Sequence, residues 1–153
     1  MRVLLIDDHA LVRKGLEQLL ESRGIDVVAA VGTGSEGIAC AREMAPDIVL
    51  LDIKMPDMNG LETLLQLRAQ GIEVPVLMLT MSRDEADLQA ALRGGAQGYL
   101  LKDMEPEDLV PALQDAMKGN NVVAKELIGS LTRIVQGQPK KDLRPGTLLS
   151  DLT

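Results

Sequence analysis

The chain has 153 residues, of which 23 are acidic and 16 basic, with one Cys, one Tyr and neither Phe nor Trp. This length fits one domain with a short extension, the acidic balance argues against a chain that grips nucleic acid through a basic face, and a lone Cys cannot form an internal disulfide. No apolar run approaches a membrane span of ~20 residues or the apolar region of a signal peptide, so we expect a cytoplasmic protein without membrane contact.

Five short runs of aliphatic residues recur along the chain and predict strands buried on both faces of a parallel sheet. These runs lie at 3–6, 27–31, 48–51, 74–79 and 98–101. The segments between them carry apolar residues at helical spacing, and Gly24, Gly71 and Gly94 fall where such helices should end. Strand and helix therefore alternate, which predicts a doubly wound α/β fold with a five-stranded sheet.

The C-terminal part of the chain departs from this alternation. A fifth helix is expected from about Glu105, either kinked at Pro111 or effectively beginning there, because an interior Pro removes a helix hydrogen bond. The Gly119-Asn120-Asn121 break predicts that the domain comprises residues 1–120. Residues 121–136 carry one amphipathic stripe and predict a linker helix, whereas residues 137–153 show no sustained period and are expected to form a flexible linker.

Polar side chains stand where four of the predicted strands end. Asp7 and Asp8 follow the first strand, Asp52 the third, Thr80 the fourth and Lys102 the fifth. Ligands of open α/β sheets bind at the carboxyl ends of the strands, and a strand order of 2-1-3-4-5 brings the three carboxylates into one crevice. Carboxylates this close need a cation, and Mg²⁺ suits one or two carboxylates together with phosphate oxygens.

A carboxylate held beside a metal ion can act as a nucleophile on phosphorus, so Asp52 is expected to form an aspartyl-phosphate. The turn-rich segment 54–60 that follows can lend a backbone carbonyl to the ion. Lys102 would compensate one phosphoryl oxygen, the Thr80 hydroxyl a second and the ion a third. The pattern therefore predicts a magnesium-dependent phosphoryl-acceptor site.

Four motifs between residues 5 and 103 carry a family resemblance: LIDDH at 5–9, DIVLLDIKMPDMNG at 47–60, LT at 79–80 and GGAQGYLLKD at 94–103. The chain resembles the receiver domain of two-component response regulators, in the NarL/FixJ (LuxR-type) subfamily. The resemblance implies a flavodoxin-like (CheY-like) fold with Asp52 as phosphoacceptor and with Thr80 and Lys102 contacting the phosphoryl group. It also implies a switch and a metal site, with these members: Thr80 and Tyr99 for the switch; Asp7, Asp8, Asp52 and the Lys54 carbonyl for Mg²⁺.

The resemblance also implies how such a protein acts. It is expected to be no metabolic enzyme but a phosphoacceptor switch that catalyses only its own phosphorylation and dephosphorylation. The implied partners are a sensor histidine kinase, a second copy bound through the helix 4–strand 5–helix 5 face, and DNA only through a C-terminal helix-turn-helix expected to be absent from this chain. Nitrate/nitrite regulators are the most similar members, so nitrate or nitrite signalling is an expectation from resemblance alone.

Two alternatives remain open at the level of sequence. A stand-alone or degenerate receiver would act only as a protein-interaction module, although the acidic set is intact. The segment GTGSEG at 32–37 is a literal G-x-G-x-x-G, which favours a dinucleotide-binding half-domain but leaves Asp7, Asp8, Thr80 and Lys102 without a role. His9 is expected to be an exposed residue at the start of the first helix, and Cys40 a small core side chain.

Overall fold

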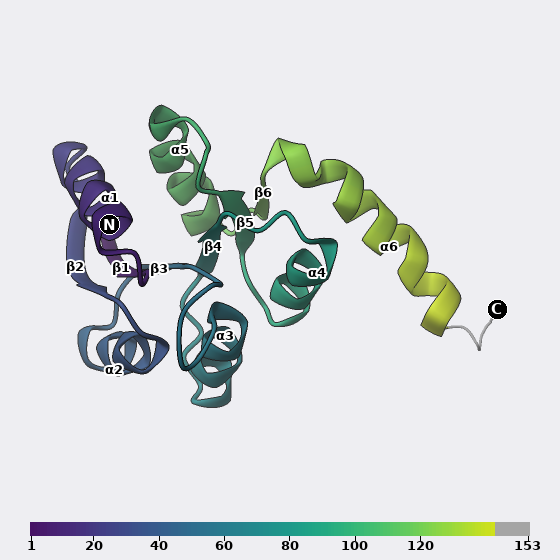
Figure 1. The fold of residues 1–153 in the computed structure, drawn as a ribbon, viewed down its shortest axis with the longest axis horizontal. Coiled ribbons are helices and arrows are strands. Elements are labelled where there is room, and N and C mark those ends of the chain that lie inside the picture. Colours follow the sequence, from purple (N-terminus) through teal and green to yellow (C-terminus); the bar gives the residue numbers. More distant parts are fainter. Residues whose placement is uncertain (143–153) are drawn as a thin grey trace.

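The computed structural model describes residues 1–142, which form a six-stranded parallel sheet with helices on both faces (Figure 1). The strands are β1 (Arg2–Ile6), β2 (Asp26–Val31), β3 (Ile48–Leu51), β4 (Val76–Thr80), β5 (Gly98–Leu101) and β6 (Val122–Val123). Their order across the sheet is β2-β1-β3-β4-β5-β6, and each neighbouring pair is parallel. The predicted doubly wound fold and the order of its first five strands are confirmed.

Each face of the sheet has its own layer of helices. The helices α1 (Ala10–Ser22) and α5 (Pro106–Met117) cover one face, and α2 (Gly34–Met44), α3 (Gly60–Ala69) and α4 (Glu85–Arg93) cover the other (Figure 1). Within β1, Leu4 and Ile6 pack toward α2, α3 and α4, while Val3 and Leu5 pack toward α1 and α5. Because both faces are buried, the strands read as continuous apolar runs. Among residues 1–142, no helix is both long and apolar enough to cross a membrane.

The sixth strand, β6, corrects the prediction of five strands. It has only two residues and pairs with β5, Val122 beside Gly98 and Val123 beside Tyr99. A strand this short shows no alternation that sequence analysis can detect. Gly98 allows its close approach, because a Cβ at that position would overlap the carbonyl of Val122. The sheet therefore continues beyond residue 120, where the break in sequence pattern predicted the domain to end.

The last helix also runs further than predicted. A short 3₁₀ turn, η1 (Lys125–Leu127), leads into α6 (Ile128–Asp142), so residues 137–142 are helical and the predicted helix end at 136 is wrong. Gly137 and Pro139 favour a helix end, but extending an established helix is less costly than nucleating one. The remainder of the predicted linker, residues 143–153, lies outside the described residues.

The proline in α5 neither delays the start of the helix nor ends it. The helix begins at Pro106, in the first turn, where a missing N–H costs nothing, and it continues through Pro111. The carbonyl that Pro111 leaves without a partner belongs to Glu107, and both residues are exposed. Water can therefore donate a hydrogen bond to this carbonyl in place of the missing N–H. The alternative of a helix beginning near Pro111 is wrong.

Candidate functional site

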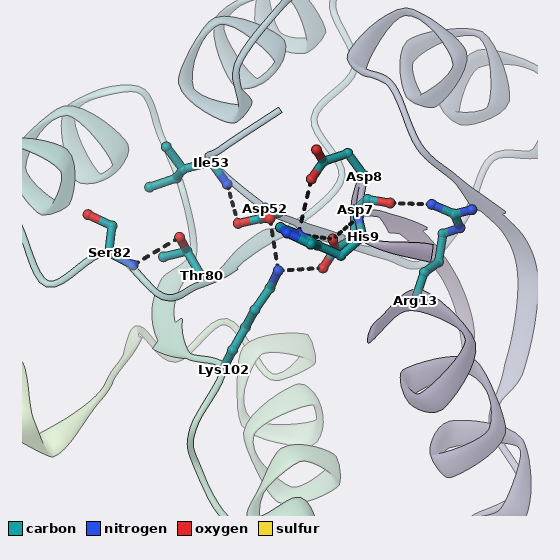
Figure 2. A network of polar contacts seen from close by, with 9 residues as sticks. All are labelled: Asp7, Asp8, His9, Arg13, Asp52, Ile53, Thr80, Ser82 and Lys102. Atoms are coloured by element: carbon teal, nitrogen blue, oxygen red, sulfur yellow. Dashed lines mark hydrogen bonds and ion pairs between the residues drawn. The ribbon is translucent and has the colours of Figure 1, made fainter. Parts of the chain in front are cut away.

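The carboxyl ends of the strands gather the predicted polar residues at one edge of the sheet (Figure 2). Ile6 pairs with Leu51, so the residues that follow them, Asp7 and Asp52, lie side by side. The backbone fixes this register further, because the Asp52 N–H donates to the Ile6 carbonyl at 3.0 Å. At the neighbouring strand end, the Lys102 N–H donates to the carbonyl of Thr80 at 2.9 Å.

Three carboxylates converge in this site. Asp7, Asp8 and Asp52, together with His9, each offer one ligand-type atom within 4.8 Å of the others. The side chains of Asp7 and Asp52 are only 2% and 3% exposed. Burying ionised carboxylates next to one another is unfavourable unless cations compensate them.

Lys102 supplies part of that compensation. Its Nζ lies 2.7 Å from Asp7 Oδ2 and 2.8 Å from Asp52 Oδ2. Burial alone would lower the pKa of Lys102, but the hydrogen bonds and charges of Asp52 and Asp7 outweigh it and hold the pKa above its usual value. One ammonium group does not balance three carboxylates, so the site retains an attraction for a further cation.

The donor set fits a divalent metal ion. Oδ1 of Asp8 is buried and accepts no hydrogen bond from the described residues, although His9 Nδ1 lies 3.3 Å away. A buried acceptor without a partner costs about 1–3 kcal/mol, a deficit that a bound ion removes. Lys54 stands at the mouth of the site, where it lines an open cavity of about 690 Å³ together with Asp8 and His9. Carboxylate and carbonyl oxygens are the ligands that Mg²⁺ prefers.

A tight turn positions Asp52 against helix α3. Gly60, the first residue of α3, packs so closely that a Cβ there would overlap the Asp52 carbonyl, and its N–H donates to the Ile53 carbonyl at 2.8 Å. Asn59 and Glu62 form a capping box at the same helix end. The N–H of Ile53 donates to Asp52 Oδ1 at 2.7 Å, so one carboxylate oxygen is already oriented by the backbone.

Thr80 and Tyr99 lie deeper and are joined by a residue that sequence analysis missed. Both side chains are fully buried. The Ser82 N–H donates to Thr80 Oγ1 at 3.2 Å, and the Tyr99 hydroxyl donates to the Ser82 carbonyl at 3.0 Å. Burial raises the pKa of Tyr99 to about 12. Ser82 also donates its hydroxyl to Asp87 at 2.6 Å, so it ties β4, β5 and α4 together.

Ser82 carried only a weak sequence signal. It lies two residues beyond Thr80, just before the capping residue Asp84, which is a position typical of any strand-to-helix loop. Its contacts with Thr80 and Tyr99 use its backbone N–H and carbonyl, which sequence pattern does not encode.

The glycines of the G-x-G-x-x-G segment have a packing role. A Cβ at Gly34 would overlap Thr63 of α3, and one at Gly37 would overlap Ile6 of β1. Thr33 caps α2 by accepting from the N–H of Glu36 at 3.1 Å. A pyrophosphate at this helix end would meet an occupied N–H and the carboxylate of Glu36, so the dinucleotide interpretation loses its support.

Fold and site together define a class of protein: an open α/β domain in which carboxylates, a lysine and a hydroxyl side chain stand at the ends of adjoining strands. The family model described as the response regulator receiver domain matches residues 3–114. The nitrate/nitrite response regulator protein NarL of Escherichia coli K12 is 46% identical over 126 residues, which are 82% of this chain and 58% of that protein.

Solved structures agree with this match. A two-component response regulator of the LuxR family from Aurantimonas sp. SI85-9A1 superimposes with a TM-score of 0.82 at 31% identity, over 88% of this chain and 97% of that one. The signal receiver domain of the response regulator NarL from Mycobacterium tuberculosis gives a TM-score of 0.74 at 33% identity, over 78% and 97% of the two chains.

This chain therefore belongs to the receiver domain family of two-component response regulators, in the NarL/LuxR group. Such domains are signalling switches rather than metabolic enzymes, they interact with sensor kinases, and they use Mg²⁺ in phosphorylation. The chain spans 58% of the length of the Escherichia coli relative.

Proposed function

We propose that this domain accepts a phosphoryl group on Asp52 in a magnesium-dependent reaction and changes conformation in response. The observation that carries the proposal is the convergence of Asp7, Asp8 and Asp52 with Lys102, which contacts two of the three carboxylates. Phosphoryl transfer depends on positioning and on compensation of charge more than on covalent catalysis by the protein. An acidic crevice with one ammonium group suits both requirements.

In the proposed reaction, a carboxylate oxygen of Asp52 attacks the phosphorus of a phosphohistidine or of a small acyl phosphate. The bond from phosphorus to the donor nitrogen or oxygen breaks, and the leaving group takes the bonding electron pair. Mg²⁺, when held by Asp7, Asp8, Asp52 and the Lys54 carbonyl, supplies positive charge to the phosphoryl oxygens. Lys102 exchanges its contact with Asp52 for one with a phosphoryl oxygen, and the Thr80 hydroxyl donates to another.

The proposed switch runs through Ser82. When Thr80 turns toward the phosphoryl group, its Oγ1 loses the bond from the Ser82 N–H, which holds the loop between β4 and α4. The Ser82 carbonyl is also the acceptor of the Tyr99 hydroxyl, so Tyr99 responds to the same movement. The phosphoryl group then shifts the population between two arrangements of Thr80, Ser82 and Tyr99.

The partners follow from the family and are part of the proposal. A sensor histidine kinase would supply the phosphoryl group, and relatives named as nitrate/nitrite regulators make nitrate or nitrite the candidate signal. A second copy would bind at the α4–β5–α5 face, and DNA would be bound through a C-terminal helix-turn-helix domain of the longer relatives. Helix α6 contacts α4 in the described structure, so a dimer at that face requires α6 to move.

Intact-mass measurement after incubation with Mg²⁺ and acetyl phosphate tests the proposal. The wild-type protein should gain the mass of one phosphoryl group, and chelation of Mg²⁺ should prevent it. Asp52→Asn should not react, since its amide is no nucleophile toward phosphorus. An unmodified wild-type protein, or equal modification of Asp52→Asn, would contradict the proposal and would favour the interaction-module alternative.

A further inference from the structure

His9 brings a nitrogen donor to the edge of the acidic site. Its Nδ1 lies 3.3 Å from Asp8 Oδ1 and 3.7 Å from Asp7 Oδ1. Figure 2 shows the imidazole beside these carboxylates, and its ligand atom lies within 4.8 Å of those of all three acids. The side chain is 64% exposed. Sequence analysis predicted an exposed residue at the start of the first helix, but not its position next to the carboxylates.

The imidazole of His9 is held beside the site but does not stabilise helix α1. The N–H of His9 donates to Asp7 Oδ1 at 2.9 Å, which ties the backbone of His9 to the site. His9 is the residue that precedes helix α1, yet its side chain makes no capping hydrogen bond. The ring therefore stands at the mouth of the site, free of any role in the helix.

We propose that His9 is a further ligand, through an imidazole nitrogen, of the divalent ion that Asp7, Asp8, Asp52 and the Lys54 carbonyl would hold. The imidazole would consequently strengthen the binding of Co²⁺, Ni²⁺ or Zn²⁺ relative to that of Mg²⁺. Imidazole suits these ions, whereas carboxylate and water ligands suit Mg²⁺ and Mn²⁺. The proposal concerns the same metal site as the proposed function and rests on it to that extent.

The contribution of His9 is measured by comparing metal binding with and without its imidazole. A site made only of carboxylates also binds Co²⁺ and Zn²⁺, because the order of affinities among first-row divalent ions holds for oxygen as well as nitrogen ligands. A nitrogen ligand adds a contribution that Mg²⁺ hardly shares. Removal of His9 should therefore weaken the transition-metal ions selectively.

Calorimetric titration with CoCl₂ and with MgCl₂ measures this selectivity in the wild-type protein and in His9→Ala. The substitution should weaken Co²⁺ binding about 10-fold or more and change Mg²⁺ binding by no more than about twofold. His9→Gln should behave like His9→Ala, because it restores bulk and polarity but no imidazole nitrogen.

Two features of the chain make the experiment specific. His9 is the single His, so a shift of imidazole ¹⁵N resonances on addition of Zn²⁺ reports on this side chain alone. Cys40 is the single Cys, it packs against the core, and burial raises the pKa of its thiol. Cys40→Ser should therefore leave Co²⁺ binding unchanged, which excludes a thiol ligand.

Equal weakening of Co²⁺ and Mg²⁺ by His9→Ala, no weakening of either, or imidazole resonances that do not move with Zn²⁺ would overturn the proposal. Phosphorylation of Asp52 is measured on the same samples, so that failure of the His9 proposal can be distinguished from failure of the proposed function. If His9→Ala selectively weakens Co²⁺ binding but acetyl phosphate does not modify the protein, His9 is supported as a metal ligand and phosphorylation of Asp52 is contradicted. If Asp52 is phosphorylated normally but His9→Ala has no selective effect on Co²⁺ binding, the proposed function is supported and His9 is rejected as a ligand.

Discussion

Lys102 occupies the space between Asp7 and Asp52, where its ammonium group contacts one oxygen of each carboxylate. Its side chain is 9% exposed, so these contacts form in a medium that screens charge poorly. At the scale of single residues, the site is a cluster of charges in which the buried carboxylates and the ammonium group stabilise one another. Their positions at strand ends made these residues predictable from sequence. Ser82 was not predictable, because it contacts Thr80 and Tyr99 through its backbone N–H and carbonyl.

Replacement of Lys102 by Met removes the cation and leaves two buried carboxylates. In buffer without divalent ions, we expect the free energy of unfolding to fall by about 3–5 kcal/mol, the usual cost of breaking a buried pair. Mg²⁺ should recover part of the loss by replacing the missing charge. Urea denaturation with and without Mg²⁺ measures both effects, and Lys14→Met, at an exposed position, is the matched control. Equal losses for the two variants would contradict this assignment of Lys102.

Tyr99 should titrate near pH 12 in the folded protein. Burial disfavours the phenolate and raises the pKa from 10.0 to about 12, so this residue contributes stability that is complete below pH 10 and is lost as the pH rises toward 12. The chain has one Tyr and no Trp, so ultraviolet absorbance of the phenolate reports on Tyr99 alone. Tyr99→Phe should flatten the fall in stability over this range. A midpoint near pH 10 in the folded protein would show that the hydroxyl is not buried.

At the scale of elements, aliphatic runs and glycine breaks located five strands and the five helices that pack on them, because burial on both faces leaves a strong sequence signal. The pattern failed where that signal is absent. β6 has only two residues, and α6 continues through Gly137 and Pro139, which normally mark a helix end. The site benefited from the same signal, since its residues directly follow strands.

The junction of β3 and α3 depends on Gly60. A methyl group there would overlap the Asp52 carbonyl, so Gly60→Ala should displace Asp52 or α3 and cost about 1–3 kcal/mol of stability. Gly15→Ala provides the contrast, since it lies in α1 with open space around it and should stabilise the helix by about 0.5–1 kcal/mol. Chemical denaturation compares the two, and equal effects of both substitutions would rule out a steric role for Gly60.

At the scale of the whole molecule, the C-terminal segment is attached to β5 and α4. The Ala124 N–H donates to the Tyr99 carbonyl at 2.9 Å, and Leu127 packs in the same core as Leu88 of α4. Arg133 of α6 pairs with Glu85 of α4 at 3.0 Å. Figure 1 shows α6 running beside α4. A movement of α4 or Tyr99 would therefore disturb the packing of α6.

Two adjacent residues of α6 test this packing. Ile134 is 8% exposed and Val135 is 58% exposed. Ile134→Ala should lower stability by about 2–4 kcal/mol and increase hydrogen exchange in β6 and α6, because it removes buried methyl groups. Val135→Ala should change neither, and thermal melting with exchange measurements distinguishes them. Similar small effects of both would mean that α6 does not pack on α4 in solution.

A phosphoryl group on Asp52 is proposed to change the arrangement of Thr80, Ser82 and Tyr99 and thereby the surface that α4 and α6 share. Hydrogen–deuterium exchange with Mg²⁺, in the presence and absence of beryllofluoride as a phosphoryl mimic, tests it most directly. We predict that exchange changes in residues 81–84, around Tyr99 and along α4 in the wild-type protein, and that Asp52→Asn abolishes the change. Identical exchange in both states, or the same change in Asp52→Asn, would contradict the account.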